Sequence, residues 1–516
     1  MEIKLYQSNE SDLLKRIFEV LDLKEEYRQQ LLHPRYTLSE NHASCLQAVK
    51  ERIIQAKKNG EKVFVAGDYD ADGVMATTIM KDLLDQLGIE NGYYIPDRFK
   101  EGYGLNAKIV QMAYDKGYRL IITVDNGVKA FEAIDLAKSL GMDVIVSDHH
   151  LYDQELNGVI VVHPDLMEAP FHKMCGAGMA LEIAKLFIED PRHVVFAMIA
   201  TIGDIMPLWD ENRTIVLLGL KLLNQYRFLN ICKLIDKKLP YDEVDMAFQL
   251  IPKINTIGRL EDESNPNMLV KYFLSKRLEE IDLVKNQIND KNKLRKELSK
   301  EMVDRCNALI QEEGFILLES EDFHEGMCGL AAGSIVRSHL RPCVILSKQD
   351  NLYKGSGRGI AGFDIHQYLS QYSDLFETFG GHKMAVGLSI YQSQLNQLKE
   401  HLKQDQIKIK EEAQWVIPVS VEEISLEVVS KIHQFKPYGE GFRLPLLYMD
   451  DFNVSKFQLI KGKYPKWTIE HHQKLEAISF QSDKKIIENP QFMIFEPTIN
   501  TFNGQQSVSL LVKSVG

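Results

Sequence analysis

The sequence predicts an α/β protein in which a parallel-sheet domain and a smaller α/β domain are joined by a long helix and followed by a β-barrel domain. Short apolar strands alternate with helices between residues 60 and 165, which is typical of a parallel sheet. Residues 265–312 are rich in charge and almost free of Gly and Pro, which predicts a long helix. The last hundred residues hold many short strands separated by turn residues, which indicates a small barrel or sandwich.

The composition is that of an ordinary globular protein. The chain has 516 residues, of which 45% are hydrophobic and 26% charged, so we expect about three or four domains. It has no apolar run of the ~18 residues that a membrane-spanning helix needs. The first residues lack the basic and apolar regions of a signal peptide. We therefore expect a cytoplasmic protein without a membrane partner.

Cysteines and net charge exclude some classes of function. The six cysteines are scattered without a CxxC pair, which argues against a structural zinc site and a disulfide framework. The net charge of −12 would by itself argue mildly against nucleic acid as a partner. This total includes carboxylates that bound cations would offset, so local patterns of charge must decide.

The first two segments follow from the hydrophobic pattern. Residues 1–45 are expected to form an N-terminal helical segment, and residues 46–264 the first domain. An amphipathic helix ends at Gly60, and strands then alternate with helices. The expected strands are KVFVAG, YRLIITVD, DVIVSD and GVIVVHP, and the helices are GVMATTIMKDLLDQLG and VKAFEAIDLAKSLG.

The other segments complete the expected fold. Residues 265–312 are expected to form a rigid connector helix with a solvated, mixed-charge face. Residues 313–405 form the second α/β domain, with the strands GFILLES and PCVILSK and a glycine-rich turn at GSGRG. Residues 415–516 are β-rich and form the last domain.

Acidic and imidazole side chains follow three strands of the first domain. Parallel strands bring their carboxyl ends to one edge of the sheet, where ligands bind. A fourth acid lies in the apolar segment ATIGDIMPL, where a lone carboxylate would be costly. The side chains expected to gather are Asp68, Asp70, Asp72, Asp125, Asp148, His149, His150 and Asp204.

This set of ligands predicts a metal site. Carboxylates suit Mn²⁺ or Mg²⁺, and imidazole shifts the preference toward Mn²⁺. The number of acids suggests two ions, which in such sites lie about 3.5–4 Å apart, activate water and stabilise in-line displacement at phosphorus. Asp125 is the expected bridge between them. Acids after strands also cap helices, and this is the alternative for Asp68.

The motifs resemble those of a known family. GDYDADG, VDNG, SDHH and IGDIMPL, in this order, resemble the four motifs of the DHH phosphoesterase superfamily. PDRFKEGYGLN, PKINTIGRL, HEGMCGLAAG, GSGRG, FGGHKMAVGLSI and FKPYGEG resemble its RecJ family, which consists of 5′→3′ exonucleases specific for single-stranded DNA. The resemblance implies a DHH catalytic domain at 46–264, a DHHA1 domain at 313–405 and a nucleic-acid-binding OB-fold at 415–516.

The resemblance also implies roles for the acids. Asp70 and Asp72 are similar to the first-motif ligands, one for each ion, and Asp125 to the bridging ligand. His149 and Asp204 resemble ligands of the second ion. One departure is Ala66, because some relatives have a histidine ligand at this position, four residues before the first ligand. One ion is then held by fewer protein ligands and more water.

The remaining catalytic candidates are also implied by the family. His150 resembles a histidine that acts close to the scissile phosphate, and Asp148 would orient a neighbouring histidine. Asp68 is grouped with them as a catalytic candidate. His382, in GGHKMAVG, resembles the signature histidine of the DHHA1 domain and is expected to contact the phosphate being cut.

The resemblance implies contacts with the DNA as well. Arg98, Ser356 and Arg358 match residues that hold a 5′-phosphate, for which guanidinium groups and backbone amides are suited. Arg259 is similar to an arginine on the strand path. Tyr103 is a candidate for stacking on a base, with a core aromatic residue as the alternative. An ordinary glycine turn is the alternative for GSGRG.

Two further motifs allow simpler readings. GAGMALEIA is better explained by helix packing than by a dinucleotide site, because it follows no clear strand. KFQLIKGKYPKWTIEHHQK has five lysines, one glutamate and the interleaved aromatics Phe457, Tyr464 and Trp467, a pattern typical of single-strand binding. A solvated strand with inward-facing aromatics is the alternative.

Together these features predict a two-metal exonuclease that releases 5′-mononucleotides from single-stranded DNA, preferably 5′-phosphorylated, through a cleft too narrow for duplex. The resemblance suggests repair and recombination roles, a monomer, and a helicase and a single-stranded-DNA-binding protein as partners. One alternative is a DHH phosphatase, pyrophosphatase or short-oligonucleotide nuclease, but such chains lack the last domain. The other is an inactive scaffold, which would have broken metal motifs.

Overall fold

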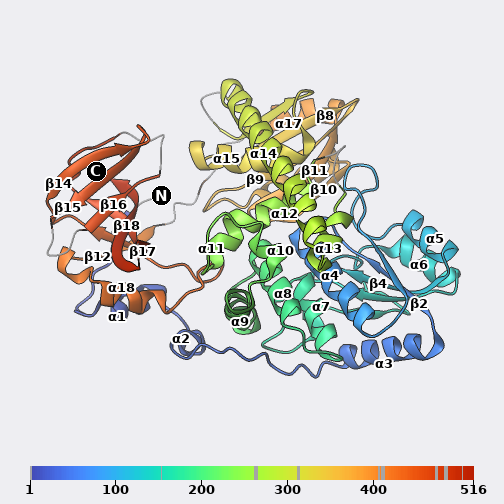
Figure 1. Ribbon diagram of the computed structural model, residues 1–516. Coiled ribbons are helices and arrows are strands. Elements are labelled where there is room, and N and C mark those ends of the chain that lie inside the picture. Colours follow the sequence, from blue (N-terminus) through green and yellow to red (C-terminus); the bar gives the residue numbers. More distant parts are fainter. Residues whose placement is uncertain are drawn as a thin grey trace.

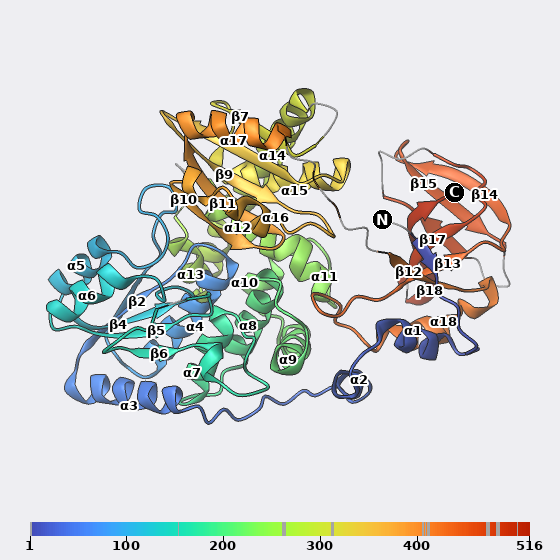
Figure 2. The same cartoon turned by 180° about the vertical axis from the view of Figure 1, so that it is seen from behind.

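Figures 1 and 2 show two lobes stacked on each other and a third domain beside them, with both ends of the chain at the third domain. The computed structural model describes residues 3–516 except 153, 261–264, 311–313, 405–406, 408, 410–412, 471–474, 481–485 and 503. The described residues form three sheets, one in each domain.

The first domain is built on a parallel five-stranded sheet with the order β3-β2-β4-β5-β6. Its strands are β2 (Lys62–Ala66), β3 (Asn91–Tyr94), β4 (Tyr118–Val124), β5 (Asp143–Ser147) and β6 (Ile160–Val162). The sequence does not predict β3, because this short edge strand has no buried residue. Its parallel partner is β2, which is buried and strongly apolar.

Helices cover both faces of this sheet, because alternate strand residues point to opposite sides. Val63 and Val65 pack with the larger cluster, and Phe64 with the smaller. The smaller cluster includes α5 (Ala107–Asp115) and α6 (Phe131–Ser139). The larger cluster includes α3 (Ser44–Asn59), α4 (Ala71–Gln86), α7 (Gly176–Lys185), α8 (Pro191–Gly203) and α9 (Asp210–Tyr226).

The connector differs from the single helix that the sequence predicts. It consists of α13 (Asn267–Leu274) and α14 (Leu278–Leu309), separated where Ser275 adopts an extended conformation. The apolar side chains of α13 are buried in the first domain, whereas most of α14 is exposed and charged. At 32 residues, α14 spans about 48 Å between the two lobes.

Shorter helices complete the first domain. They are α10 (Leu229–Cys232), α11 (Glu243–Asp245), a π-helical turn (Met246–Leu250) and α12 (Ile251–Ile257). Single turns of 3-10 helix lie at Pro164–Leu166, Glu325–Met327, Ser373–Leu375 and Val421–Glu423.

The second domain has a mixed sheet with the order β10-β11-β9-β8-β7. The pair β7–β8 is parallel and the other pairs are antiparallel. The strands are β7 (Ile316–Ser320), β8 (Cys343–Gln349), β9 (Leu352–Arg358), β10 (Thr378–His382) and β11 (Ala385–Tyr391). The helices are α15 (Cys328–His339), α16 (Ile365–Ser370) and α17 (Gln392–Gln404).

The prediction of a glycine turn at GSGRG is wrong. Gly355 to Arg358 belong to the central strand β9, and only Gly359 lies beyond it. A Cβ on Gly355 would lie 1.9 Å from the Ile345 carbonyl oxygen. One on Gly357 would lie 2.7 Å from Val386 Cγ2. The glycines therefore serve close packing between strands rather than chain reversal.

The third domain has one eight-stranded sheet wrapped around a single core. The strand order is β1-β12-β13-β17-β18-β16-β15-β14. Its C-terminal elements are β12 (Gln414–Pro418), β13 (Leu446–Met449), β14 (Val454–Ile460), β15 (Tyr464–Ile469), β16 (Leu475–Ile478), β17 (Met493–Phe502), β18 (Gln505–Val515) and the helix α18 (Leu426–His433).

The N-terminal residues belong to this third domain. The segment contains β1 (Ile3–Leu5), α1 (Leu13–Leu21) and α2 (Glu25–Leu32), so the expectation of a helical segment is wrong for residues 3–5. β1 pairs with β12 in parallel, and Leu13 and Ile17 are buried in the core of the third domain. Among the helices that the structure describes, none has the length and apolar character to cross a membrane.

Candidate metal centre

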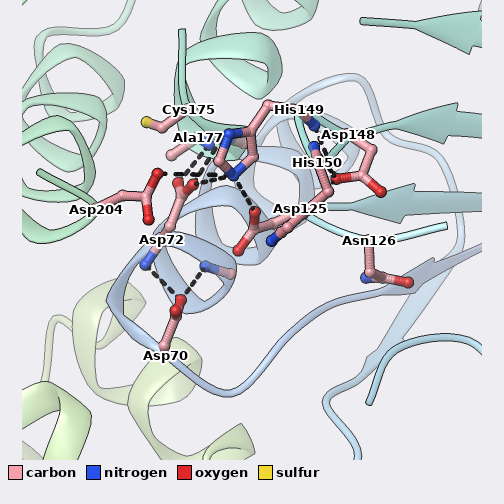
Figure 3. Close-up of polar contacts among 12 residues, drawn as sticks. Asp70, Asp72, Asp125, Asn126, Asp148, His149, His150, Cys175, Ala177 and Asp204 are labelled. Atoms are coloured by element: carbon pink, nitrogen blue, oxygen red, sulfur yellow. Dashed lines mark hydrogen bonds and ion pairs between the residues drawn. The ribbon is translucent and has the colours of Figure 1, made fainter. Parts of the chain in front are cut away.

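The acidic side chains gather beyond the carboxyl ends of β2, β4 and β5, as the parallel sheet predicts. Asp204 joins them from the C-terminal end of α8. Figure 3 shows Asp72, Asp125 and Asp204 directed toward His149.

The first motif is fixed by the start of α4. Asp70 is the N-cap, and its Oδ1 accepts hydrogen bonds from the backbone N–H groups of Asp72 (3.0 Å) and Gly73 (3.1 Å). The Asn255 side chain of α12 accepts a bond from Ala71 N–H at 2.8 Å. The capping role considered for Asp68 therefore belongs to Asp70.

Asp72 is held by the N-terminus of α7. Its two carboxylate oxygens accept N–H bonds from Gly176 and Ala177, both at 2.7 Å. A Cβ on Gly176 would lie 2.5 Å from Asp125 Cβ, so only glycine fits here. The GAG motif does begin a packed helix, but its amides also orient Asp72, which the sequence analysis misses.

His149 lies at the centre of the site. Its Nε2 is 3.1 Å from Asp125 Oδ1, 3.5 Å from Asp72 Oδ2 and 3.7 Å from Asp204 Oδ2. Burial lowers the pKa of His149 despite the opposing charge of Asp72. A neutral imidazole is the form that binds metal ions.

Asp125 occupies an unfavourable position in the absence of a cation. Its carboxylate is buried, and Oδ1 has no hydrogen-bond partner. Burial raises the pKa of Asp125 well above its usual range, and the charges of Asp72 and Asp70 raise it further. The backbone is left-handed, with φ = 61°.

Asn126 has a structural role beside the site that the sequence pattern does not predict. Its Nδ2 donates to the carbonyl oxygens of Ala66 (3.0 Å) and Val124 (2.9 Å), and its Oδ1 accepts from Leu105 N–H (3.0 Å). It therefore ties the ends of β2 and β4 to the loop before α5. The only signal in the sequence is its place in VDNG.

The donor atoms fit cation binding. Three overlapping groups each have ligand atoms within 4.8 Å of one another, and Asp125 and His149 each belong to two of them. Asp68 Oδ1, like Asp125 Oδ1, is buried without a hydrogen-bond partner. These carboxylate and imidazole donors suit Mn²⁺ or Mg²⁺. The groups are Asp68–Asp70–Asp125, Asp72–His149–Asp204 and Asp125–His149–His150.

A fourth group of similar composition has another explanation. Asp82, Asp190 and His193 also lie within 4.8 Å of one another. The Arg192 guanidinium is 2.7 Å from both Asp82 and Asp190 and supplies the positive charge. This group is therefore a side-chain ion-pair network.

Asp148 holds His150. Its Oδ1 lies 2.8 Å from His150 Nδ1 and accepts from His149 N–H, and its Oδ2 accepts from Val128 N–H at 3.0 Å. Burial alone would raise the pKa of Asp148, but the bond from His150 keeps it below its usual range. Burial alone would lower the pKa of His150, but its bond to Asp148 raises it to about 9.

Tyr103 is half-exposed but is also hydrogen-bonded within the site, and Asp204 is less buried than its apolar sequence neighbours suggest. The Tyr103 ring is 49% exposed, yet its hydroxyl donates to the Asp125 carbonyl oxygen at 2.9 Å and lies 3.2 Å from His150 Nδ1. The Asp204 side chain is 32% exposed despite its apolar neighbours in sequence. Partial burial, together with the charges of Asp72 and Asp70, raises the pKa of Asp204 to about 8.

Three arginines form a positive cluster beside these acids. Burial, together with the charges of Arg98 and Arg358, lowers the pKa of Arg259 to about 10. Burial also lowers the pKa of Arg358, with Arg98 again contributing. The Arg98 guanidinium stacks 5.2 Å over the Tyr69 ring. Among the described residues, no carboxylate forms an ion pair with any of the three, so the cluster is suited to an anion.

The cluster forms because the two lobes meet closely. A Cβ on Gly326 of the second domain would lie 2.1 Å from the Arg259 carbonyl oxygen. Phe99 of the first domain lies edge-on to His324, with ring centroids 6.3 Å apart. The second domain thus contributes its residues directly opposite the first-domain loops.

Family models match the chain in three segments. They are the DHH family N-terminal domain at residues 62–204, the DHHA1 domain at 312–407 and the RecJ OB domain at 417–514. The chain therefore carries DHH and DHHA1 domains followed by a RecJ OB domain. The fold is therefore that of a DHH domain, a DHHA1 domain and an OB domain in this order, as expected from the motifs.

Curated relatives agree with this assignment. The single-stranded-DNA-specific exonuclease RecJ of Bacillus subtilis is 31% identical over 91% of this chain, which spans 63% of that relative. The enzyme of the same name from Escherichia coli is 26% identical over 92% of this chain and 90% of its own length.

Solved structures of the RecJ family share the fold. RecJ of Thermus thermophilus in complex with Mn²⁺ matches the whole chain with a TM-score of 0.82, at 21% identity and over 79% of that chain. An exonuclease RecJ bound to manganese matches 71% of this chain and 95% of its own, with a TM-score of 0.61 and 26% identity.

Three residues that are predicted to contact DNA belong to the DHHA1 domain. Ser356 and Arg358 both face α15, since a Cβ on Gly329 would lie 3.5 Å from Ser356 Oγ and 2.9 Å from an Arg358 nitrogen. His382 is exposed at the end of β10. Its contact with a scissile phosphate remains a prediction.

The basic stretch of the OB domain supports stacking at only some of its aromatics. Trp467 is 1% exposed and its indole N–H donates to the Ile487 carbonyl oxygen at 3.0 Å, so it is a core residue. Tyr464 is partly exposed, with Lys463 Nζ 4.6 Å above its ring and Phe480 beside it. Residues 471–474, at the end of the predicted stretch, lie outside the described residues.

Proposed function

We propose that this chain is a metal-dependent exonuclease that degrades single-stranded DNA from its 5′ end and releases 5′-mononucleotides. The observation that carries the proposal is the placement of the metal centre beside an arginine cluster built by both lobes. A phosphodiester is an anion, so its binding and cleavage would use both the metal centre and the arginine cluster. The B. subtilis and E. coli relatives, named as exonucleases for this substrate, support it.

The metal centre would hold two ions. Asp68, Asp70 and Asp125 supply one group of ligand atoms and Asp72, His149 and Asp204 the other, with Asp125 close to both. When bound, Mn²⁺ or Mg²⁺ lowers the pKa of water and neutralises charge on the phosphate. The amides of α7 and the start of α4 keep Asp72 and Asp70 in place.

His150 and Asp148 would act as a pair at the scissile phosphate. The hydrogen bond that His150 Nδ1 donates to the Asp148 carboxylate leaves Nε2 of His150 directed away from that carboxylate. With its pKa raised to about 9, the imidazole carries a proton at neutral pH and can donate to a phosphate oxygen. His382 of the DHHA1 domain is proposed to contact the same phosphate from the opposite lobe.

The substrate end would be read by both lobes. Arg98 and Arg358, with the Ser356 hydroxyl, are proposed to bind the 5′-phosphate. Arg259, which lies between the lobes, is proposed to contact the next phosphates. Tyr103 is proposed to meet the first base with its exposed ring, while its hydroxyl stays bonded to Asp125. The close approach of the lobes favours single strands over duplex.

Digestion of end-labelled DNA tests this proposal. With Mn²⁺, 5′-labelled single strands are expected to release labelled mononucleotide at once, and 3′-labelled strands only at the end of digestion. EDTA and Asp72→Ala are expected to abolish both. A blunt duplex digested as fast as a single strand, or label released first from the 3′ end, would contradict the proposal.

The cellular setting is proposed from the similarity to RecJ exonucleases. We infer a cytoplasmic monomer that acts in DNA repair and recombination on strands opened by a helicase and covered by a single-stranded-DNA-binding protein. The OB domain is proposed to extend the strand path, with the partly exposed Tyr464 and the exposed Phe480 among its stacking aromatics. Asp70, Asp72, Asp125, His149, His150 and Asp204 are all present, which argues against an inactive scaffold.

A further inference from the structure

The loop that follows Asp204 has a strained backbone. Ile205 at its start and Asp210, the first residue of α9 after it, have φ angles of 55° and 57°, in the left-handed region that non-glycine residues seldom adopt. Ile205 is β-branched, and its side chain is 66% exposed, so burial does not compensate. Such conformations persist where surrounding contacts determine them.

Contacts with the OB domain hold this loop. The residues concerned, 435–442, are here called the junction loop. Leu208 N–H donates to the Glu440 carbonyl oxygen at 2.9 Å. The Trp209 indole N–H donates to the Gly441 carbonyl oxygen, also at 2.9 Å. A residue four positions from Asp204 is thus bonded directly to another domain.

Packing reinforces these hydrogen bonds. The Trp209 ring stacks on Tyr27 of α2 at 4.6 Å and lies 5.1 Å from the Phe442 ring. Leu208 packs so closely that a Cβ on Gly439 would lie 2.6 Å from its Cδ1. The loop therefore fits into a surface formed by the junction loop and α2.

Arg213 fixes the junction loop from the side of the DHH domain. Its side chain is buried, and its guanidinium donates to the carbonyl oxygens of Phe435 (2.7 Å), Lys436 (3.2 Å) and Pro437 (3.3 Å). The three carbonyl oxygens are thus bonded to one buried side chain of α9. The junction loop is therefore held in place relative to the DHH domain.

We propose that the OB domain has a second role, which is to position Asp204 for metal binding through the junction loop. Leu208 and Trp209 are the positioning residues on the loop itself. The inference rests on the proposed function of Asp204 as a ligand. It makes the metal affinity of the catalytic domain depend on contacts more than 200 residues away in the sequence.

Two glycine variants of the full-length chain provide a matched comparison. Gly441 has φ = 74°, and an added Cβ would lie 3.0 Å from Trp209 Nε1. Gly504 of the same domain has φ = 79°, with no atom within 4 Å of an added Cβ. Gly441→Ala and Gly504→Ala thus introduce similar backbone strain, but only the first disturbs the contact with Trp209. Trp209→Phe, which removes the N–H donor and reduces the ring while keeping an aromatic side chain, is the second variant.

The experiment measures Mn²⁺ binding by monitoring the EPR signal of the free ion. Asp204→Asn is expected to lower the affinity for one of the bound Mn²⁺ ions. Gly441→Ala and Trp209→Phe are expected to lower the affinity for the same ion by about 10-fold, as loss of a supporting contact does. Gly504→Ala is expected to match the wild type. Trp209→Phe keeps the test valid if Gly441→Ala does not fold.

The outcomes separate two kinds of failure. If Asp204→Asn weakens Mn²⁺ binding but both junction variants bind as Gly504→Ala does, the positioning role is wrong and the metal centre stands. If Asp204→Asn itself leaves Mn²⁺ binding unchanged, Asp204 is not a ligand, and the inference falls together with that part of the proposed function.

Discussion

Individual side chains of the metal centre are placed where only a cation makes them favourable. Asp125 and His149 each belong to two groups of ligand atoms, and Asp125 is buried with an oxygen that has no hydrogen-bond partner. Asp204 lies at the partly exposed edge of the site, with Oδ2 3.7 Å from His149 Nε2. Binding of a cation would turn these mutually repelling acids into a stabilising set.

The pH dependence of metal-free stability tests this view at Asp204. Its folded pKa is raised to about 8, against an ordinary value of about 3.9, so the folded state binds a proton that the unfolded state lacks between these values. In EDTA, the melting temperature of the wild type relative to Asp204→Asn should fall as pH rises from 5 to 8. Added Mn²⁺ should reverse the difference at pH 8. A difference that is constant with pH in EDTA would contradict the raised pKa.

At the scale of elements, the sheet of the DHHA1 domain depends on the close approach of neighbouring strands at glycine positions of β9. The central strand β9 passes between β8 and β11 with Gly355 facing the backbone of Ile345. The same strand carries Ser356 and Arg358 to the interface between the lobes. Packing of the sheet and placement of the phosphate-binding residues are therefore linked.

Substitution of this glycine should destabilise the DHHA1 domain. Gly355→Ala is expected to cost about 1–3 kcal/mol, because its Cβ would lie 1.9 Å from a backbone oxygen that cannot move without parting the strands. Gly387→Ala, on the neighbouring strand β11, meets nothing within 4 Å and should change stability by less than about 0.5 kcal/mol. Thermal unfolding of the two variants compares them directly, and equal midpoints would be inconsistent with this packing.

Sequence periodicity predicts those elements whose burial is set locally. β2, β4 and β5 are apolar and buried, so these strands and the gathering of acids at their carboxyl ends are predictable. β3 and GSGRG are misread because tertiary contacts, rather than local pattern, decide their conformation. The amides of α7 that hold Asp72, 104 and 105 residues away, leave no local signal at all.

At the scale of the whole molecule, function requires all three domains in fixed positions. The arginine cluster takes Arg98 and Arg259 from the DHH domain and Arg358 from the DHHA1 domain. The N-terminal strand β1 pairs with β12, so the two ends of the chain meet in the OB domain. The chain therefore passes from the OB domain through the catalytic lobes and back.

The division of the arginine cluster between lobes predicts a selective defect. Arg358→Gln should raise KM for a 5′-phosphorylated single strand about 10-fold or more, since it removes a charge-assisted hydrogen bond, and should leave a 5′-hydroxyl strand unaffected. Arg337→Gln removes an exposed charge from the same domain and serves as the control. An equal loss on both substrates would show that Arg358 does not read the terminal phosphate.

The proposed chemistry depends on a pair of ions that share Asp125. Asp125→Asn keeps the shape of the side chain, and asparagine tolerates the left-handed backbone at this position. The measurement is a Mn²⁺ titration of both proteins by calorimetry with EPR spectra of the bound ions. The wild type should bind two Mn²⁺ that couple magnetically, as expected at about 3.5–4 Å, and Asp125→Asn no coupled pair. A single Mn²⁺ in the wild type, or an unchanged coupled pair in the variant, would contradict the account.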